Sequence, residues 1–213
     1  MSERVATNTV SHALADWAIR TRPCEGEREN GDRTIVRPRE DGLLVAMVDG
    51  LGHGAEAARA ADIAVDAITR LAHRPIDAIL AGCHAALFGS RGAALGLALL
   101  DRQRGLSWLS VGNVDAAHLR ASEASRRGAQ RPALIVPHAG IVGARLPTVR
   151  AVERSLAEGD LVVLATDGID PALFDALDAS LPIDIAVDRL FERYARADDD
   201  ASIVLLRWKA TAS

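Results

Sequence analysis

Aromatic residues make up only 3% of the 213 positions in this sequence. This shortage, together with other residue patterns that the sequence lacks, excludes several functional classes. With so few aromatics, no block of lysine and arginine, and a net charge of −4, the chain offers no footprint for nucleic acid. The two cysteines, Cys24 and Cys83, are too few for a disulfide framework and lack the spacing of a zinc site. We therefore expect a protein of the reducing cytoplasm that does not bind nucleic acid.

Long hydrophobic runs are also missing. The longest apolar stretch, Gly92–Leu100, is far shorter than the roughly 20 residues that a membrane-spanning helix needs. The segment Met1–Val10 is polar and does not contain the apolar core of a signal peptide. We predict that the protein does not associate with membranes and is cytoplasmic.

The 49% of residues that are apolar are enough to bury one sizeable core. The short apolar run Leu43–Val48 ends at Asp49-Gly50 and is typical of a buried strand. Apolar residues then recur every three or four positions from Ala57 to Leu71, which predicts an amphipathic helix that ends before Pro75. A second helix is expected over Ile76–Leu87.

Strand patterns dominate the rest of the chain. We predict a first antiparallel pair at Trp17–Thr21 and Thr34–Arg37, and an exposed loop at Ser122–Arg131. The further expected elements are a meander of Ala93–Leu100, Leu106–Val111 and Ala116–Arg120, strands at Ala133–Val136, Thr148–Leu156, Leu161–Thr166 and Ala201–Trp208, and helices at Pro171–Ala179 and Ile183–Arg196. Because strands arrive in runs, an α+β domain of antiparallel sheets with helices packed outside is favoured over a doubly wound fold.

Acidic residues stand where strands meet turns. Asp49 and Asp167 each end an apolar strand and precede a glycine, Asp32 precedes the strand at Thr34, and an acidic triplet ending in Asp199-Asp200 precedes the last strand. A single Asp-Gly is usually only a turn. Converging carboxylates, however, would repel one another by roughly 4 kcal/mol for a pair 4 Å apart at an effective dielectric near 20. Mg²⁺ or Mn²⁺ would relieve that repulsion, and both prefer oxygen ligands.

Glycines follow Asp49 in a pattern that can bring backbone close to a ligand. Gly50, Gly52 and Gly54 lie between the predicted strand and the predicted helix. Amides at the start of that helix can face a phosphate, while the Gly50 carbonyl can face a metal. No Gly-Lys-Ser/Thr follows, and the spacing is not that of a dinucleotide-binding loop, so both of those readings are disfavoured.

These residues resemble the metal-dependent (PPM-type, protein phosphatase 2C-like) phosphatases, in their SpoIIE/RsbX branch. The stretch Val48–Gly54 has the branch's Asp-Gly-hydrophobic-Gly-His-Gly form. The other matching landmarks, in the family's order, are Asn30-Gly31-Asp32, Val111-Gly112-Asn113 with Ala116–Arg120, Glu158–Gly168, and Asp199–Val204. The resemblance covers residues 13–208 and implies a single phosphatase domain. The implied fold is a four-layer α-β-β-α sandwich of two antiparallel sheets flanked by helices.

The resemblance also implies a centre of two Mn²⁺ or Mg²⁺ ions. In it, Asp49 would bridge both ions, the Gly50 carbonyl would bind the second, Asp167 and Asp199 would bind the first, and Asp32 would hold metal-bound water. Asp49 and Asp167 would carry the catalysis together with this centre.

Three assignments stay open on sequence alone. Asp200 is the alternative to Asp199 as ligand, and His53 is either a general acid or a residue that positions the glycine loop. Arg22 and Arg28 are candidates for binding the substrate phosphate.

The implied function is the hydrolysis of phosphoserine or phosphothreonine on another protein. The implied substrate is a STAS-domain regulator in a stress-response or sigma-factor partner-switching pathway. A pseudophosphatase that only binds such a regulator is the alternative, and a hydrolase of small phosphate esters is a third reading. The sequence leaves open whether the chain is a monomer or a dimer.

Overall fold

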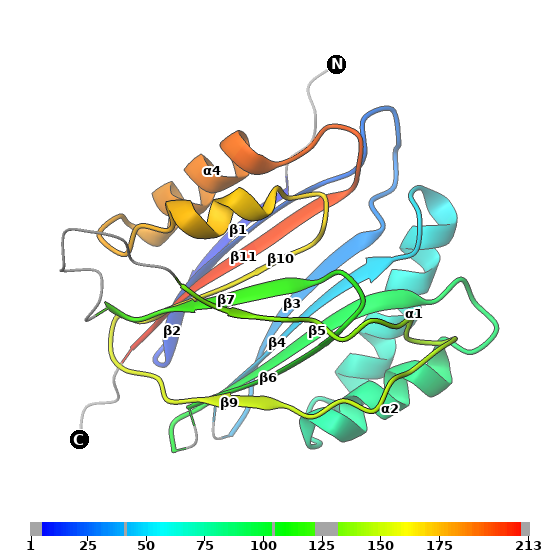
Figure 1. Ribbon diagram of the computed structural model, residues 1–213, viewed down its shortest axis with the longest axis horizontal. Helices are drawn as coiled ribbons and strands as arrows, with labels where there is room; N and C mark the ends of the chain where they lie inside the picture. The colour runs from blue at the N-terminus through cyan, green and yellow to red at the C-terminus, as the bar shows by residue number, and fades with distance from the viewer. Residues whose placement is uncertain (1–5, 41, 104, 122–131, 210–213) are drawn as a thin grey trace.

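Two antiparallel sheets stack face to face in the computed structural model (Figure 1), which describes residues 6–40, 42–103, 105–121 and 132–209. The first sheet has the order β1-β2-β11-β10-β7-β8, formed by Ala6–Ser11, Ala15–Arg22, Ala201–Trp208, Leu161–Ala165, Asp115–Leu119 and Ala133–Ile135. The second has the order β3-β4-β5-β6-β9, formed by Asp32–Pro38, Gly42–Gly50, Ala93–Asp101, Gly105–Val111 and Val152–Arg154.

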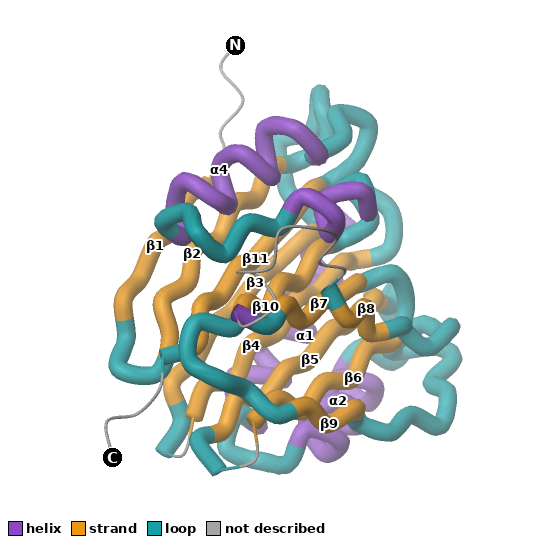
Figure 2. Tube along the Cα trace, turned by 60° about the vertical axis from the view of Figure 1, so that its left-hand side comes forward, coloured by secondary structure: helices purple, strands orange, loops and turns teal. Residues whose placement is uncertain are grey.

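Helices cover the outer face of each sheet (Figures 1 and 2). Helices α1 (Ala55–Leu71) and α2 (Ile76–Ala86) pack on the second sheet through a cluster that includes Ile68 and Ile79. Helix α4 (Ile183–Tyr194) and the 3₁₀ helix η1 (Pro171–Ala176) pack on the first sheet. A third apolar cluster, which includes the buried Trp108, fills the space between the sheets. The predicted α-β-β-α layering is therefore confirmed.

The burial of strand β4 on both faces explains why its sequence is continuously apolar. Leu43, Val45 and Met47 point into the core between the sheets, whereas Leu44, Ala46 and Val48 point toward α1 and α2. A strand that is buried on both faces has no polar side to alternate with. Its C-terminal end, where Asp49 stands, is the first point at which the strand leaves the core.

The predicted pairing of the first two strands is wrong. β2 lies in the first sheet between β1 and β11, whereas β3 lies at the edge of the second sheet and pairs with β4. The short link from Pro23 to Gly31 therefore crosses between sheets. Each strand alternates in a way that suits either partner, so only the packing of the whole chain selects the pairs.

The predicted meander is also only partly right. β5 and β6 pair, but the turn after Val111 carries β7 into the first sheet. The expected strand Thr148–Leu156 is confined to Val152–Arg154, and the helical pattern at Pro171–Ala179 forms the 3₁₀ helix η1. The predicted loop at Ser122–Arg131 lies outside the described residues. Among the described helices, none is long and apolar enough to cross a membrane.

Candidate metal and catalytic site

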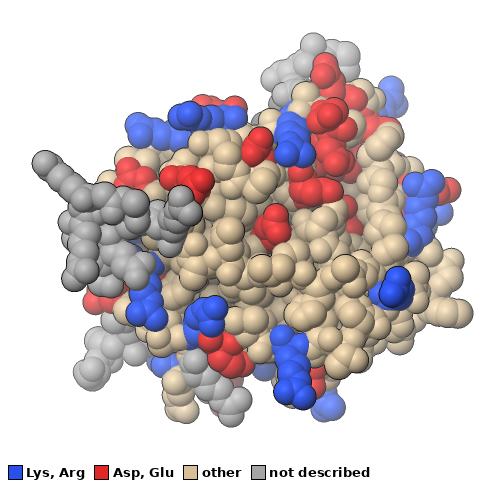
Figure 3. All heavy atoms as spheres, viewed as in Figure 1, with Lys and Arg blue, Asp and Glu red and all other residues tan. Residues whose placement is uncertain are grey.

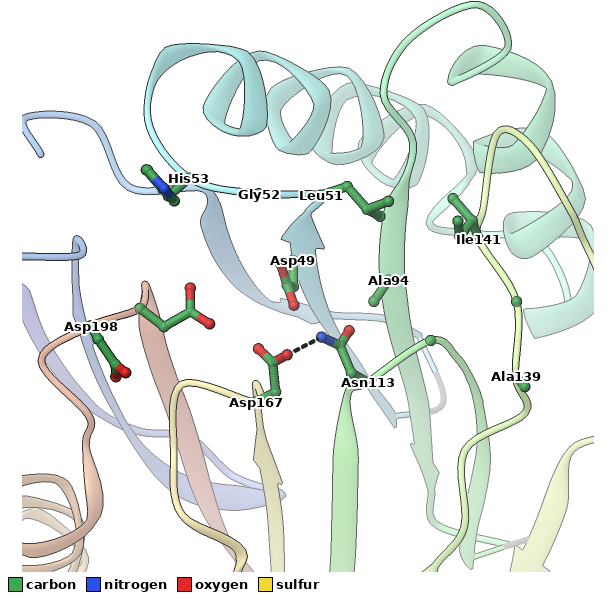
Figure 4. Close-up of a pocket in the computed structure, with 13 residues that line it drawn as sticks. Asp49, Leu51, Gly52, His53, Ala94, Asn113, Ala139, Ile141, Asp167 and Asp198 are labelled. Carbon is green, nitrogen blue, oxygen red and sulfur yellow. Dashed lines mark hydrogen bonds between the residues drawn. The ribbon is translucent and has the colours of Figure 1, made fainter.

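A pocket of about 500 Å³ opens where strand ends from both sheets meet (Figure 4). Asp49 comes from the end of β4, Asp167 follows β10, and Asp199 precedes β11. The pocket is lined by Asp49, Leu51, Gly52, His53, Ala94, Gly112, Asn113, Ala139, Gly140, Ile141, Asp167, Asp198 and Asp199. The structure thus brings three of the predicted carboxylates and His53 to one place. Gly50 and Asp32 are buried beside this pocket and do not line it.

Asp32 lies directly behind Asp49, because the register of β3 and β4 pairs the two residues. Its side chain is buried, and Thr166 Oγ1 donates a 2.7 Å hydrogen bond to its Oδ2. The other carboxylate oxygen, Oδ1, is buried without a hydrogen-bond partner among the described residues. A buried oxygen without a donor is costly, and it is suited to a cation or an ordered water.

Burial and mutual repulsion make the acidic cluster reluctant to ionise. Burial, followed by the negative charges of Asp167 and Asp199, raises the pKa of Asp49 to about 8. Burial and then Asp49 raise the pKa of Asp32 well above its usual value. Burial and then Asp167 also raise the pKa of Asp199. The binding of a cation would stabilise the ionised form of such a carboxylate cluster.

Asp199 and Asp200 are adjacent in sequence but occupy different environments. Asp199 lines the pocket, and its Oδ1 accepts a 2.9 Å hydrogen bond from the Asp200 amide. Asp200 is buried, and its two carboxylate oxygens accept 2.8 Å hydrogen bonds from the amides of Cys24 and Gly31. Asp200 therefore fastens the link between the sheets, while Asp199 faces the pocket.

The two Asp-Gly pairs at the site, Asp49-Gly50 and Asp167-Gly168, need glycine because backbone passes too close for a side chain. A Cβ on Gly50 would lie 2.1 Å from the carbonyl oxygen of Ala57, at the start of α1. A Cβ on Gly168 would lie 1.9 Å from the carbonyl oxygen of Asp200. Each glycine lets a neighbouring element approach the strand end, which brings the carboxylates together.

Asn113 is a pocket residue to which the sequence analysis gave no role. It lies in the turn between β6 and β7, and its Nδ2 donates a hydrogen bond to Asp167 Oδ2 (Figure 4). It also hydrogen-bonds to Asp49, which partly offsets the upward shift of that pKa. The sequence signal was the Gly112-Asn113 turn, but a turn explains these residues without invoking a site.

His53 lies at the rim of the pocket, above Asp198 in the view of Figure 4. Its Nδ1 is 2.8 Å from Oε1 of Glu27, a residue in the link between the sheets. The two candidate arginines do not line the pocket: Arg22 is buried and donates to the carbonyl of Arg196, and Arg28 is exposed.

A family model described as stage II sporulation protein E (SpoIIE) matches residues 39–209. The chain belongs to the SpoIIE family. The phosphoserine phosphatase RsbX of Bacillus subtilis (strain 168) is 30% identical over 91 residues, which are 42% of this chain and 46% of that protein. The match thus spans just under half of that relative's length.

Solved structures resemble this SpoIIE-family chain over nearly its whole length. One, described under the bacterial stressosome as a modular system adapted to control secondary messenger signaling, is 32% identical with a TM-score of 0.79. It covers 91% of this chain and 99% of its own. The structure of RsbX in complex with magnesium is 20% identical with a TM-score of 0.85 and covers 96% of this chain and 100% of its own, which shows the same fold.

The pocket of this SpoIIE-family chain fits a hard divalent cation. Its charged lining consists of carboxylates apart from His53, and a buried oxygen of Asp32 stands unpaired behind them. Oxygen donors of this kind are the ones that Mg²⁺ and Mn²⁺ prefer. Within the described ranges, no group of three or more histidine, cysteine, aspartate or glutamate side chains is arranged so that it could hold a metal ion by itself. Mg²⁺ is usually held by one or two carboxylates and keeps several water ligands, so its binding does not require such a group.

The raised pKa of Asp49 predicts a pH dependence for the metal-free protein. The Asp49 carboxyl binds its proton more tightly in the folded protein than in the unfolded chain, where its pKa is near 3.8. The contribution of Asp49 to stability is therefore expected to be fully present below pH 3.8 and to be lost as the pH rises through about 8, a loss on the order of a few kcal/mol. Urea unfolding of chelator-treated protein between pH 5 and 9 measures this. The fall should be smaller in Asp49→Asn, and an equal fall in both proteins would contradict it.

Proposed function

We propose that this protein is a metal-dependent phosphatase that hydrolyses phosphoserine or phosphothreonine on a regulatory protein. The observation that carries this proposal is the convergence of Asp49, Asp167 and Asp199 from three separate strand ends into one pocket. Groups held together against their own repulsion are characteristic of functional sites. The family and the partial match to a phosphoserine phosphatase support the same activity. The proposed phosphatase domain comprises residues 13–208.

The proposed centre holds two Mn²⁺ or Mg²⁺ ions. Asp49 would hold both ions, the Gly50 carbonyl would hold the second, and Asp167 and Asp199 would hold the first. Asp199 is assigned in preference to Asp200 because the carboxylate of Asp200 is engaged by two backbone amides. When bound, the ions supply Lewis acidity to water and offset the charge of the phosphoryl group.

The side chains of the chain itself position what the ions act on. Asp32 is assigned to orient water, since its Oδ1 is buried and without a donor among the described residues. Asn113 donates a hydrogen bond from its Nδ2 to the Asp167 carboxylate and so restrains it. Catalytic groups that are already held in position lower the activation barrier, because they need little reorganisation during the reaction.

The proposed substrate is a phosphorylated STAS-domain protein of a stress-response or sigma-factor pathway. The partial match to RsbX and the likeness to a stressosome structure support a regulatory protein as partner. A cytoplasmic location fits such a pathway, and Cys24 and Cys83 are both free. Acidic side chains gather near the start of β11, in the upper right of Figure 3.

A folded phosphoprotein is therefore expected to be a far better substrate than a peptide that carries the same phosphoserine. Contacts remote from the phosphate can orient it and raise turnover. We expect kcat/KM for a folded phospho-STAS protein to exceed that for its peptide by at least about tenfold. Phosphate release from the pair, with and without Mn²⁺, measures this. Phosphotyrosine should be poor in either form.

The outcomes separate the remaining readings. Equal kcat/KM for folded protein and peptide would remove the support for a regulatory partner and favour a hydrolase of small phosphate esters. Tight binding of the phosphoprotein without any release, at saturating metal, would favour the pseudophosphatase alternative.

A further inference from the structure

The link Pro23–Gly31 carries a carboxylate to the edge of the pocket. Asp200 fastens this link at both ends through the amides of Cys24 and Gly31, and the Glu27 amide donates a 3.0 Å hydrogen bond to the Cys24 carbonyl. Glu27 is thereby placed beside the glycine loop that follows Asp49. The side chain of Glu27 is 36% exposed, so its position is defined by these contacts and not by deep burial.

The Glu27 carboxylate makes two contacts there. Its Oε1 lies 2.8 Å from Nδ1 of His53, and its Oε2 lies 3.0 Å from the place that a Cβ on Gly54 would occupy. Gly54 caps α1 at its N-terminus, where no side chain accepts a hydrogen bond from the helix. One carboxylate therefore holds the histidine and lies over the start of α1.

The pairing fixes how the His53 ring presents itself. An ionised carboxylate can only accept, so the proton of this hydrogen bond belongs to Nδ1. The opposite nitrogen, Nε2, has no hydrogen-bond partner among the described residues, and the ring lines the pocket beside Asp198 and Asp199. A histidine held at Nδ1 by a carboxylate presents Nε2 in a fixed direction.

We propose that Glu27 is the positioning residue for His53 and that His53 Nε2 donates the proton to the departing serine or threonine oxygen. This inference rests on the proposed phosphatase function. As water attacks phosphorus, the bond from phosphorus to the side-chain oxygen breaks and its electron pair stays on that oxygen. The donor in this step is the doubly protonated ring: its Nε2 proton passes to this oxygen and completes the alcohol, and Nδ1 keeps its own proton. Glu27 keeps its charge and its hydrogen bond to Nδ1, and the ring recovers a proton from solvent.

Charged side chains from three parts of the chain lie around the ring. Glu27, Asp198 and Asp199 face it from the link and from the start of β11. The positive charge of Arg91 flanks the loop at Gly52, but its guanidinium is paired with Glu56.

Substrates with different leaving groups test the proton donation. Serine must leave as an alcohol and needs the proton, whereas p-nitrophenolate leaves well without it. In Mn²⁺-loaded enzyme, His53→Gln is expected to lower kcat on a phosphoserine peptide by about 100-fold and kcat on p-nitrophenyl phosphate by no more than about twofold. Glu27→Ala should lower kcat on the phosphoserine peptide by about tenfold and leave kcat on p-nitrophenyl phosphate unchanged. Equal losses on both substrates would overturn the proposal.

Two further variants separate positioning from folding. Glu27→Gln keeps an acceptor for Nδ1 and should recover part of the phosphoserine activity lost in Glu27→Ala. Glu29→Ala, an exposed carboxylate two residues away, should match wild type on both substrates. If Glu27 only caps α1, Glu27→Ala will melt earlier and both substrates will suffer alike.

A readout without turnover tests the Glu27 role by itself. Nitrogen-15 NMR of the neutral His53 ring in metal-free protein reports which nitrogen carries the proton. Wild type should hold it on Nδ1, and Glu27→Ala should move it toward Nε2. If the proton stays on Nδ1 of His53 in Glu27→Ala, the positioning role of Glu27 alone would be overturned. Wild type that releases phosphate from neither substrate would overturn the proposed function and the proton donation together.

Discussion

Asp49→Asn and Asp167→Asn are each expected to abolish turnover, by at least about 10³-fold, without unfolding the protein. Asparagine keeps the shape of the side chain but loses the charge that a divalent cation needs. Asp49 lies at the centre of the pocket, and the adjacent negative charges help to raise its pKa to about 8. Removing one charge from such a cluster relieves repulsion in the metal-free state.

Thermal melting of the metal-free proteins tests the expectation that these substitutions do not unfold the protein. Asp49→Asn should melt at or above the temperature of wild type, and its advantage should be larger at pH 9 than at pH 6, because wild-type Asp49 ionises near pH 8. Asp66→Asn, the same change on the exposed face of α1, is the control and should keep full activity. If the metal-free site variants melt well below wild type, these aspartates are structural and the proposed site is wrong.

Exhaustive chelation is expected to remove turnover almost completely, again by at least about 10³-fold, and added Mn²⁺ or Mg²⁺ should restore it. The reason is that the described pocket holds carboxylates and one histidine, with no arginine or lysine in its lining to meet a phosphate dianion. Without cations, the pocket repels its substrate. Phosphate release from p-nitrophenyl phosphate or a phosphoserine peptide measures the loss.

Metal binding should also stabilise the fold, and this provides a measurement that does not depend on turnover. A ligand at 100 times its Kd stabilises the folded state by about 2.7 kcal/mol for one site. Wild type should therefore melt at a higher temperature with Mn²⁺, whereas Asp49→Asn should respond little. Full turnover of protein shown to be metal-free by elemental analysis would rule the metal mechanism out.

The position of Asp49 and Asp167 was predictable because each ends an apolar strand. A run such as Leu43–Val48 has to stop where the strand leaves the core, and the next residues are therefore at the sheet edge. Burial and periodicity are local properties of the sequence, and they also predicted α1, α2 and the layered α+β architecture. The order of the motifs along the chain was enough to indicate the family that the comparison shows.

Which strands pair, and which side chains meet, was decided only by the tertiary structure. β2 and β3 are near neighbours in sequence but belong to different sheets, because the cores on either side of each sheet select the partners. That crossing creates the link that bears Glu27 and brings it to His53, 26 residues away along the chain.

Asp199 and Asp200 illustrate the same division between sequence and fold. Asp199 lies in the bend before β11 and lines the pocket, whereas Asp200 directly precedes the strand and is buried. The sequence supplied both carboxylates, and the amides of Cys24 and Gly31 determined which one was buried. Local sequence thus determined where the carboxylates stand, and long-range packing determined which of them share the pocket.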